Sequence, residues 1–330
     1  LATQNFSTST DTHNVAVGNV AGTAITTGIR NTLIGSGAGN ALTDADLNVA
    51  VGRDALTSDT LGSQSVAIGT NALANQNYTT ATNSLNTAVG HSAGSSVTTG
   101  IQNTLIGGLA GDALTDADYN VAVGKSALSS DTLGSRAVAI GQSALAAQNF
   151  TTATTSYNVA VGDSAGLSIT TGVDNTLIGG LAGDAITDAD FNVAVGNSAL
   201  SANTVGSKNT AIGSSALLVM NPATATDSLN TAVGYHAGRL VSSGKEHTLI
   251  GGLAGDALTS GDRNVAIGTN ALSTDTQGSR NVAVGYDSLK TQNFTAYSIY
   301  ISRSNYFPTH SLHHYNCYCH ILYILTWHSL

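Results

Sequence analysis

Glycine recurs along this chain at intervals of 17, 17, 17 and 21 residues, and this pattern repeats with a period of 72 residues. The periodic glycines are Gly18, Gly35, Gly52, Gly69, Gly90, Gly107, Gly124, Gly141, Gly162, Gly179, Gly196, Gly213, Gly234, Gly251, Gly268 and Gly285. A short, fixed period is typical of a solenoid, in which each repeat packs on its neighbours. Seventeen residues are too few for a pair of helices but suit one coil of two short strands and two turns. The sequence therefore predicts an all-β fold, a parallel β-roll or β-solenoid of about sixteen coils.

The chain divides into a repetitive array, residues 1–296, and a non-repetitive tail, residues 297–330. The array holds four 72-residue units, and because residues 4–6 match residues 148–150, we expect it to be cut from a longer array. The tail lacks glycine and contains both cysteines, Cys317 and Cys319, so a zinc site is conceivable there, although no second ligand pair has finger-like spacing. We expect the tail to be disordered, or to be a frame or junction artefact.

The three residues before each periodic glycine are a β-branched residue, then Ala or Leu, then Val or Ile. This alternation has the period of a β-strand, whose successive side chains point to opposite faces. We expect Val15, Val17, Val49, Val51 and their equivalents to fill the interior of the coils. Bulk is exchanged between positions, since Leu replaces the strand alanine in the second coil of each unit, as close packing requires.

Asparagine stands four residues before the periodic glycine in thirteen of sixteen coils, the exceptions being Ser65, Ala137 and His247. We call these residues the ladder asparagines, because side-chain amides stacked coil on coil would each donate to the next. The predicted ladder begins with Asn14, Asn31, Asn48, Asn86, Asn103 and Asn120.

A column of hydroxyl residues lies eight residues after the glycine, as at Thr26, Thr43 and Thr60, with Asn77 in the fourth coil. Rows of threonine are found in ice-binding solenoids, so a single-chain ice-binding protein is one alternative. The other interpretation is a corner ladder of hydrogen bonds to the backbone, which the interruption by asparagine in every fourth coil favours.

The fourth coil of each unit is four residues longer, and its additional segment is rich in threonine. In a solenoid such insertions form loops on one side. An aromatic residue opens most of these segments, either as an exposed ring that stacks on a ligand or as a ring folded back over its own loop. The predicted ligand contacts are Phe6, Tyr78, Thr79, Thr80, Phe150, Thr151, Thr152 and Phe294.

Aspartates recur in the second coil of each unit, and the candidate metal ligands are Asp116, Asp118, Asp188 and Asp190. Paired carboxylates can bind Ca²⁺, but aspartates at turns more often cap their own backbone, which is the preferred interpretation. A carboxylate pair can also hydrolyse glycosides, yet an active site normally occurs once, whereas this pair recurs in register. We therefore expect no catalytic site and no cofactor other than the weak Ca²⁺ candidate.

The composition argues against nucleic acid as a partner and against insertion into a membrane. Charged residues make up 9% of the chain, the net charge is −9, and no cluster of Lys or Arg is present, so nucleic acid is not an expected partner. No run of 18 apolar residues occurs, so we expect no membrane insertion in this segment.

The outer strand face would carry Ala or Leu in every coil and no charge, which leaves a long apolar stripe. A stripe of this size is typical of an association surface, and a rod most simply closes by cyclic symmetry. We therefore predict a homotrimer with Ala16, Ala50, Ala88 and Ala122 near the shared axis.

The string Asn-Val-Ala-Val-Gly-x-x-Ala, found at residues 48–55, 120–127 and 192–199, resembles the head repeat of YadA-like trimeric autotransporter adhesins, and similar repeats occur in phage and viral fibres. The resemblance covers the whole array and implies a left-handed parallel β-roll in which three chains pack around one axis. It also implies an extracellular adhesin or fibre, on a cell surface or virion, that attaches to a cell-surface glycan or protein. A passive structural filament or spacer is a further alternative.

Overall fold

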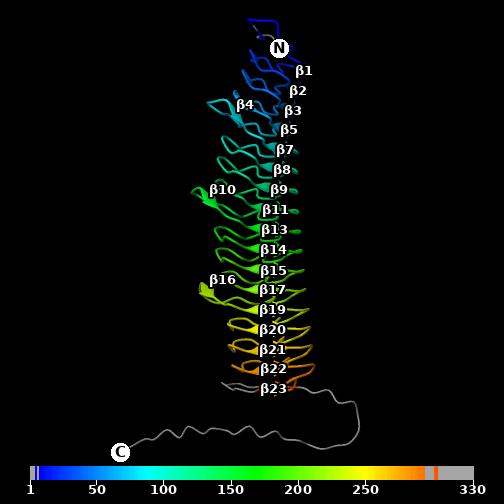
Figure 1. Cartoon of the computed structure of the whole chain (residues 1–330), viewed down its shortest axis with the longest axis vertical. Coiled ribbons are helices and arrows are strands. Elements are labelled where there is room, and N and C mark those ends of the chain that lie inside the picture. The colour runs from blue at the N-terminus through cyan, green and yellow to red at the C-terminus, as the bar shows by residue number, and fades with distance from the viewer. Residues whose placement is uncertain (1–3, 6, 294–300, 304–330) are drawn as a thin grey trace, which may run out of the picture.

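The computed structural model describes residues 4–5, 7–293 and 301–303. In this part of the chain, every regular element is a β-strand and the strands stack into a single rod (Figure 1). The prediction of an all-β parallel solenoid with about sixteen coils is therefore confirmed.

One main sheet runs along the rod, and each coil contributes to it the three residues that precede its periodic glycine. Its strands are β1 (Val15–Val17), β2 (Thr32–Ile34), β3 (Val49–Val51), β5 (Val66–Ile68), β7 (Thr87–Val89), β8 (Thr104–Ile106), β9 (Val121–Val123), β11 (Val138–Ile140), β13 (Val159–Val161), β14 (Thr176–Ile178), β15 (Val193–Val195), β17 (Thr210–Ile212), β19 (Thr231–Val233), β20 (Thr248–Ile250), β21 (Val265–Ile267), β22 (Val282–Val284) and β23 (Ile301–Arg303). Each strand pairs in parallel with the strand of the next coil, so equivalent residues stack on one another, as Ala122 does on Ala139.

Two-residue strands form separate pairs at the long coils: β4 (Gly62–Ser63) with β6 (Thr82–Asn83), β10 (Gly134–Ser135) with β12 (Thr154–Thr155), and β16 (Gly206–Ser207) with β18 (Thr226–Asp227). The other coils have one strand each rather than the two that we expected. The segment after the glycine forms turns instead, because several of its residues adopt left-handed backbone angles, as at Ser126 and Leu128 (φ 54° at each).

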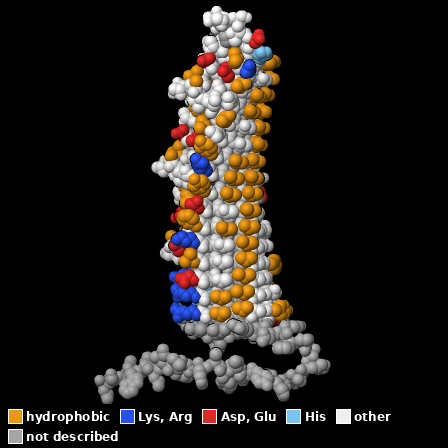
Figure 2. Space-filling view, viewed as in Figure 1, with side chains coloured by type: hydrophobic (Ala, Val, Ile, Leu, Met, Phe, Trp, Pro, Cys, Tyr) orange, Lys and Arg blue, Asp and Glu red, His pale blue; other side chains and the backbone are white. Residues whose placement is uncertain are grey.

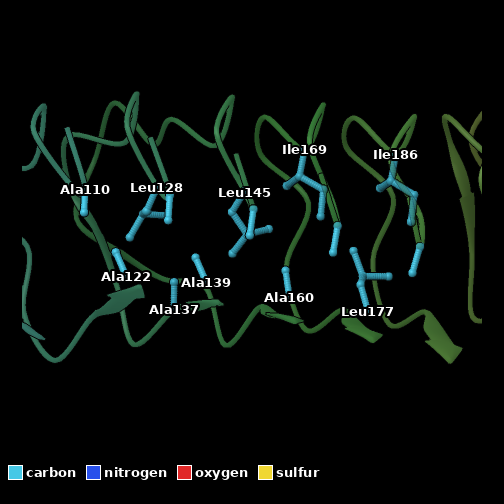
Figure 3. Packing of buried hydrophobic residues seen from close by; sticks show 14 of the residues in the cluster. Ala110, Ala122, Leu128, Ala137, Ala139, Leu145, Ala160, Ile169, Leu177 and Ile186 are labelled. Atoms are coloured by element: carbon cyan, nitrogen blue, oxygen red, sulfur yellow. The ribbon is translucent and has the colours of Figure 1, made fainter. Parts of the chain in front are cut away.

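The strand faces point opposite to the prediction. Ala50, Ala88 and Ala122 are fully buried, whereas Val15 and Val17 are 46% and 58% exposed. The reason is the width of the coil: the opposite wall already supplies apolar side chains, so the space between the walls takes one side chain per strand, which is Ala, or Leu in the second coil of each unit. Figure 3 shows this arrangement, with Ala122, Ala139 and Leu177 directed at Leu128, Leu145 and Ile186 across the interior.

The predicted exchange of bulk between positions is present inside the coils. Leu105 replaces the strand alanine, and the facing position is Gly111. A Cβ at Gly111 would lie 2.7 Å from Leu105 Cδ2 and 2.9 Å from Leu114 Cδ1. The larger strand residue therefore occupies the volume that a side chain at position 111 would need.

The predicted boundary at residue 296 is not where the main sheet ends, because β23 pairs in parallel with β22. The rest of the tail, including Cys317 and Cys319, lies outside the described residues. No segment within the described part of the chain forms a helix that could cross a membrane.

Candidate functional site

The long coils build a loop that projects from one side of the rod, near the labels β4, β10 and β16 in Figure 1. The short strand pair at each base fixes where the loop leaves the coil. Beyond it, Thr79, Thr80, Thr151 and Thr152 are exposed, as the sequence analysis required for ligand contacts. The loops thus present hydroxyl groups to solvent once in every 72 residues.

The loop is anchored on a buried polar cluster, which consists of Asp59, Gln76, Tyr78 and Asn86 in the first unit. The Asp59 carboxylate accepts hydrogen bonds from Gly62 N (3.0 Å) and from Gln76 Nε2 (2.7 Å). Asn86 Nδ2 donates in turn to Gln76 Oε1 at 2.9 Å. Burial raises the pKa of Asp59, while the hydrogen bonds from Gln76 and from backbone N–H groups oppose the shift. The hydrogen bonds of the cluster therefore offset the cost of burying the Asp59 carboxyl group.

The aromatic rings belong to this anchor and not to the surface. Tyr78 and Phe150 are 4% and 5% exposed, and the Tyr78 hydroxyl donates to the Gly100 carbonyl at 2.7 Å. Burial also raises the pKa of Tyr78. The prediction of these two rings as ligand contacts is corrected, because both rings are buried against neighbouring coils, Tyr78 beside Gly62 and Phe150 beside Gly134; Phe6 and Phe294 lie outside the described residues.

The residues of the anchor change together from one 72-residue unit to another. Asp131 and Gln148 repeat the carboxylate–amide bond of the first unit, at 2.6 Å. In the third unit Asn203 replaces the aspartate, and Met220 and Pro222 replace the glutamine and the aromatic residue. Asn203 then bonds both backbone groups of Gly206, so its side chain needs no glutamine donor. This joint change indicates that the cluster acts as one packing unit.

The ladder asparagines form an internal column that is interrupted at Ser65, Ala137 and His247, and their bonds run mainly through the backbone. Asn86 Oδ1 accepts from the backbone N–H of Asn103 at 2.8 Å, and Asn103 Nδ2 donates to the Ala117 carbonyl at 2.7 Å. The direct amide contact, from Asn103 Nδ2 to Asn86 Oδ1, is longer, at 3.3 Å. Each ladder residue therefore replaces a backbone hydrogen bond that the turn leaves unmade. Asn14, Asn31, Asn48 and Asn120 bond in the same way.

The recurrent aspartates cap turns of the preceding coil. Asp118 Oδ1 and Asp190 Oδ1 each accept a backbone N–H at 2.8 Å, from Ile101 and Val173 respectively. Asp116 Oδ1 accepts the Thr99 hydroxyl at 2.6 Å. Asp188 accepts the hydroxyl of its neighbour Thr187. Across the described residues, no group of three His, Cys, Asp or Glu side chains is placed to hold a metal ion.

The hydroxyl column is a hydrogen-bond ladder. Thr98 Oγ1 donates to the Thr115 carbonyl at 3.2 Å, and Thr115 Oγ1 donates to the Thr132 carbonyl at 3.0 Å. Thr132 then donates to Asn149 Oδ1 and to the Phe150 carbonyl. These hydroxyls thus donate to the chain itself, which is the arrangement that the corner-ladder interpretation predicts.

An apolar face follows the outer side of the main sheet along the rod, and it consists of the first and third residues of each strand. We call it the Val/Ile face, since the third residue of every main-sheet strand from β1 to β22 is Val or Ile, while the first residue is Val or Thr. Ile106, Ile140, Ile178 and Ile212 are each 38% to 39% exposed. Figure 2 shows the face as hydrophobic stripes that run the length of the described rod. The sequence analysis placed this surface on the alanines instead.

A second column was missed in the sequence analysis. It consists of the residue directly before each ladder position, and it includes the exposed rings of Tyr119, Tyr157 and Phe191. We call it the flank column; Figure 2 shows side chains of every class following one another along that flank. Aligning the coils on their periodic glycines and reading the position before the asparagine would have revealed it.

No protein-family model matches the chain, and the curated proteins contain no significant match to it.

Proposed function

We propose that this chain is a non-enzymatic attachment rod whose long-coil loops make repeated contacts with a surface. The observation that supports this most directly is the contrast within each loop: the base is buried and hydrogen-bonded, whereas the threonines beyond it are exposed. A rigid base with a free polar tip lowers the entropic cost of binding.

The spacing of the loops favours multivalent contact. One loop recurs every four coils, which corresponds to roughly 19 Å along the rod at the usual strand spacing. Each loop alone would bind weakly, but several loops on one rigid rod raise the effective concentration of the others at the same surface. The partner in this proposal is a cell-surface glycan or protein.

The rod in this proposal is a homotrimer, with the Val/Ile face in the shared interface. An apolar face as long as the rod is unusual on a chain that stays alone in water. Rotational symmetry about the long axis would keep every coil level with its copies, so a face that repeats in every coil can be covered throughout. In this proposal the rod lies outside the cell, on a cell surface or a virion, as its resemblance to trimeric adhesins and fibres implies.

The loops can be tested without disturbing their anchor. Residues 79–81, 151–153 and 223–225 would be replaced by Gly-Ser-Gly, with Tyr78, Phe150 and Pro222 kept. We expect unchanged far-UV circular dichroism and at least a tenfold loss of rod binding to cultured host cells or to a glycan array.

The matched control makes the same exchange in exposed turns of 17-residue coils and should leave binding unchanged. If the loop variant folds and still binds as the parent does, the rod is a passive spacer and the loops have no part in attachment.

A further inference from the structure

The flank column is built from one position per coil, and every residue in it has a left-handed backbone, with φ between 48° and 64°. In order along the rod it comprises His13, Arg30, Leu47, Gln64, Leu85, Gln102, Tyr119, Arg136, Tyr157, Asp174, Phe191, Lys208, Leu229, Glu246, Arg263 and Arg280. Left-handed positions favour Gly, Asn and Asp, and large side chains are uncommon there.

Large apolar residues nevertheless occupy six successive odd-numbered coils, from the third to the thirteenth. Leu47, Leu85, Tyr119, Tyr157, Phe191 and Leu229 are 45%, 48%, 40%, 56%, 53% and 51% exposed, respectively. The eight even-numbered coils carry only polar or charged residues at the same position. The alternation does not extend over the whole column, because its first and fifteenth coils carry His13 and Arg263.

The polar residues between the apolar ones make contacts along the column. The Arg136 guanidinium carbon lies 4.7 Å from the centre of the Tyr119 ring, within cation–π range. Nearer the C-terminal end, Arg263 Nε donates to Glu246 Oε2 at 2.7 Å. Tyr157 and Phe191, on either side of Asp174, are the most exposed apolar residues of the column. The column thus offers apolar platforms separated by hydrogen-bonding groups.

The interval between platforms is two coils, about 9.6 Å at the usual strand spacing. An extended peptide repeats its side chains every two residues, or about 6.7 Å, and does not match. The apolar stripe of a helix presents a side chain about every 5.4 Å, close to one coil, so half of these side chains would face the polar residues of the even-numbered coils.

Charge argues against nucleic acid and against a second copy of this chain as the ligand of the flank column. Asp174 and Glu246 lie in the column, and the chain carries a net charge of −9, which disfavours nucleic acid. A second copy related by rotation about the rod axis would bring each charge level with its own copies. A linear chain of β-1,4-linked sugars presents the same ring face at every second sugar, an interval close to two coils, and its hydroxyls can bond either sign of charge.

We propose that the flank column from Leu47 to Leu229 binds a linear β-1,4-linked polysaccharide that runs parallel to the rod axis. Every second sugar lies with its apolar face on Tyr119, Tyr157 or Phe191, while Arg136, Asp174 and Lys208 bond hydroxyls of the sugars between. This inference deepens the proposed attachment function by naming a ligand class, but it uses a surface separate from the long-coil loops.

The test uses the full chain with Tyr119, Tyr157 and Phe191 each changed to asparagine, a residue suited to left-handed backbone. Co-sedimentation with microcrystalline cellulose, chitin and insoluble mannan distinguishes the sugars, and calorimetry with cellohexaose and chitohexaose measures affinity. We expect the parent to bind at least one of these polymers, the hexasaccharide to bind more tightly than the disaccharide, and the triple variant to bind at least tenfold more weakly.

The matched control is Tyr235→Asn, which removes a tyrosine that is 57% exposed and lies outside the column; it should bind as the parent does. The loop variant described above should also keep its polysaccharide binding, so failure of the loop proposal leaves this result intact. The inference is overturned if the parent binds no polymer of the set, or if the triple variant binds equally well. A triple variant whose sedimentation shows altered self-association overturns it too, because the column would then be an interface between copies.

Discussion

At the residue scale, the ladder position shows how one side chain substitutes for a missing backbone bond. The carbonyl oxygen of a ladder asparagine accepts the backbone N–H at the next ladder position. At His247, the Nδ1 atom takes that role and accepts from the backbone N–H of Asn264 at 3.2 Å. Nδ1 can accept only while it carries no proton, so this coil depends on a neutral histidine.

The first prediction follows from the protonation of His247. Burial lowers the pKa of His247 from 6.5 to about 4. As the pH falls below about 6.5, the unfolded chain takes up a proton before the folded chain does, so the histidine's contribution is complete above 6.5 and is lost progressively down to about 4. A difference of this size corresponds to about 3 kcal/mol. His247→Asn should therefore raise the melting temperature relative to the parent at pH 4.5 more than at pH 7.5.

The measurement is thermal unfolding of both proteins across that pH range by circular dichroism. Buried carboxyls such as Asp59 have raised pKa values and act in the opposite direction, but they are common to both proteins and cancel in the comparison. Parallel pH profiles for the two proteins would contradict a neutral, hydrogen-bonded His247.

At the element scale, coils stack so closely that the periodic glycine becomes part of the interface between them. Gly124 has φ +138°, and a Cβ there would lie 2.4 Å from the carbonyl oxygen of Gly141 in the next coil. Gly108 differs, because no atom outside its chain neighbours lies within 4 Å of where its Cβ would be. Close stacking of the coils thus requires glycine at position 124, whereas position 108 has space for a side chain.

The second prediction uses these two glycines as a matched pair. Gly124→Ala should lower the free energy of unfolding by more than about 2 kcal/mol, because it strains the backbone and separates two coils. Gly108→Ala should change it by less than about 0.5 kcal/mol, as a surface substitution does. Denaturant unfolding followed by circular dichroism measures both, and equal losses in the two variants would show that coil stacking is not the constraint.

At the scale of the whole molecule, the rod has one apolar face and one chemically varied flank. The Val/Ile face repeats in every coil, whereas the flank column changes from coil to coil. A symmetric assembly needs a surface that is the same at every level, as the Val/Ile face is. In the proposals above, the rod associates through this face and binds its ligands through the loops and the flank column.

The third prediction separates association from folding. Ile140 is 38% exposed in the single chain, while Ala139 beside it is fully buried inside the coil. Ile140→Asp should leave the coil folded but dissociate a trimer, since it would bury unpaired charge at the shared face. Ala139→Asp should disrupt the coil whether or not chains associate.

Sedimentation velocity combined with circular dichroism distinguishes these outcomes. A parent protein that sediments as a folded monomer would contradict the trimer. So would an Ile140→Asp variant that sediments as the parent trimer does.

The repeat alone was sufficient to predict the number of coils, the position of each main strand and the replacement of the strand alanine by Leu in the second coil of each unit. These features depend only on local backbone geometry and on the stacking of equivalent residues, and the repeat period determines which residues are equivalent. The same is true of the hydroxyl ladder, because a column that repeats at one corner has its own next coil as its nearest partner.

The direction in which side chains point was decided only by the tertiary structure. Alternation in a three-residue strand separates two faces but does not say which is inside, and Val17 and Ala122 were therefore assigned to the wrong sides. The opposite wall of the coil made that choice, because its alanines and larger apolar residues leave room for one side chain per strand, Ala or Leu, and not for the two residues that flank it. Tyr78 points inward for a related reason. Its ring is buried near Asp59 and Gln76, and its hydroxyl donates to the Gly100 carbonyl. These residues come from different coils, so they meet only once the coils have stacked.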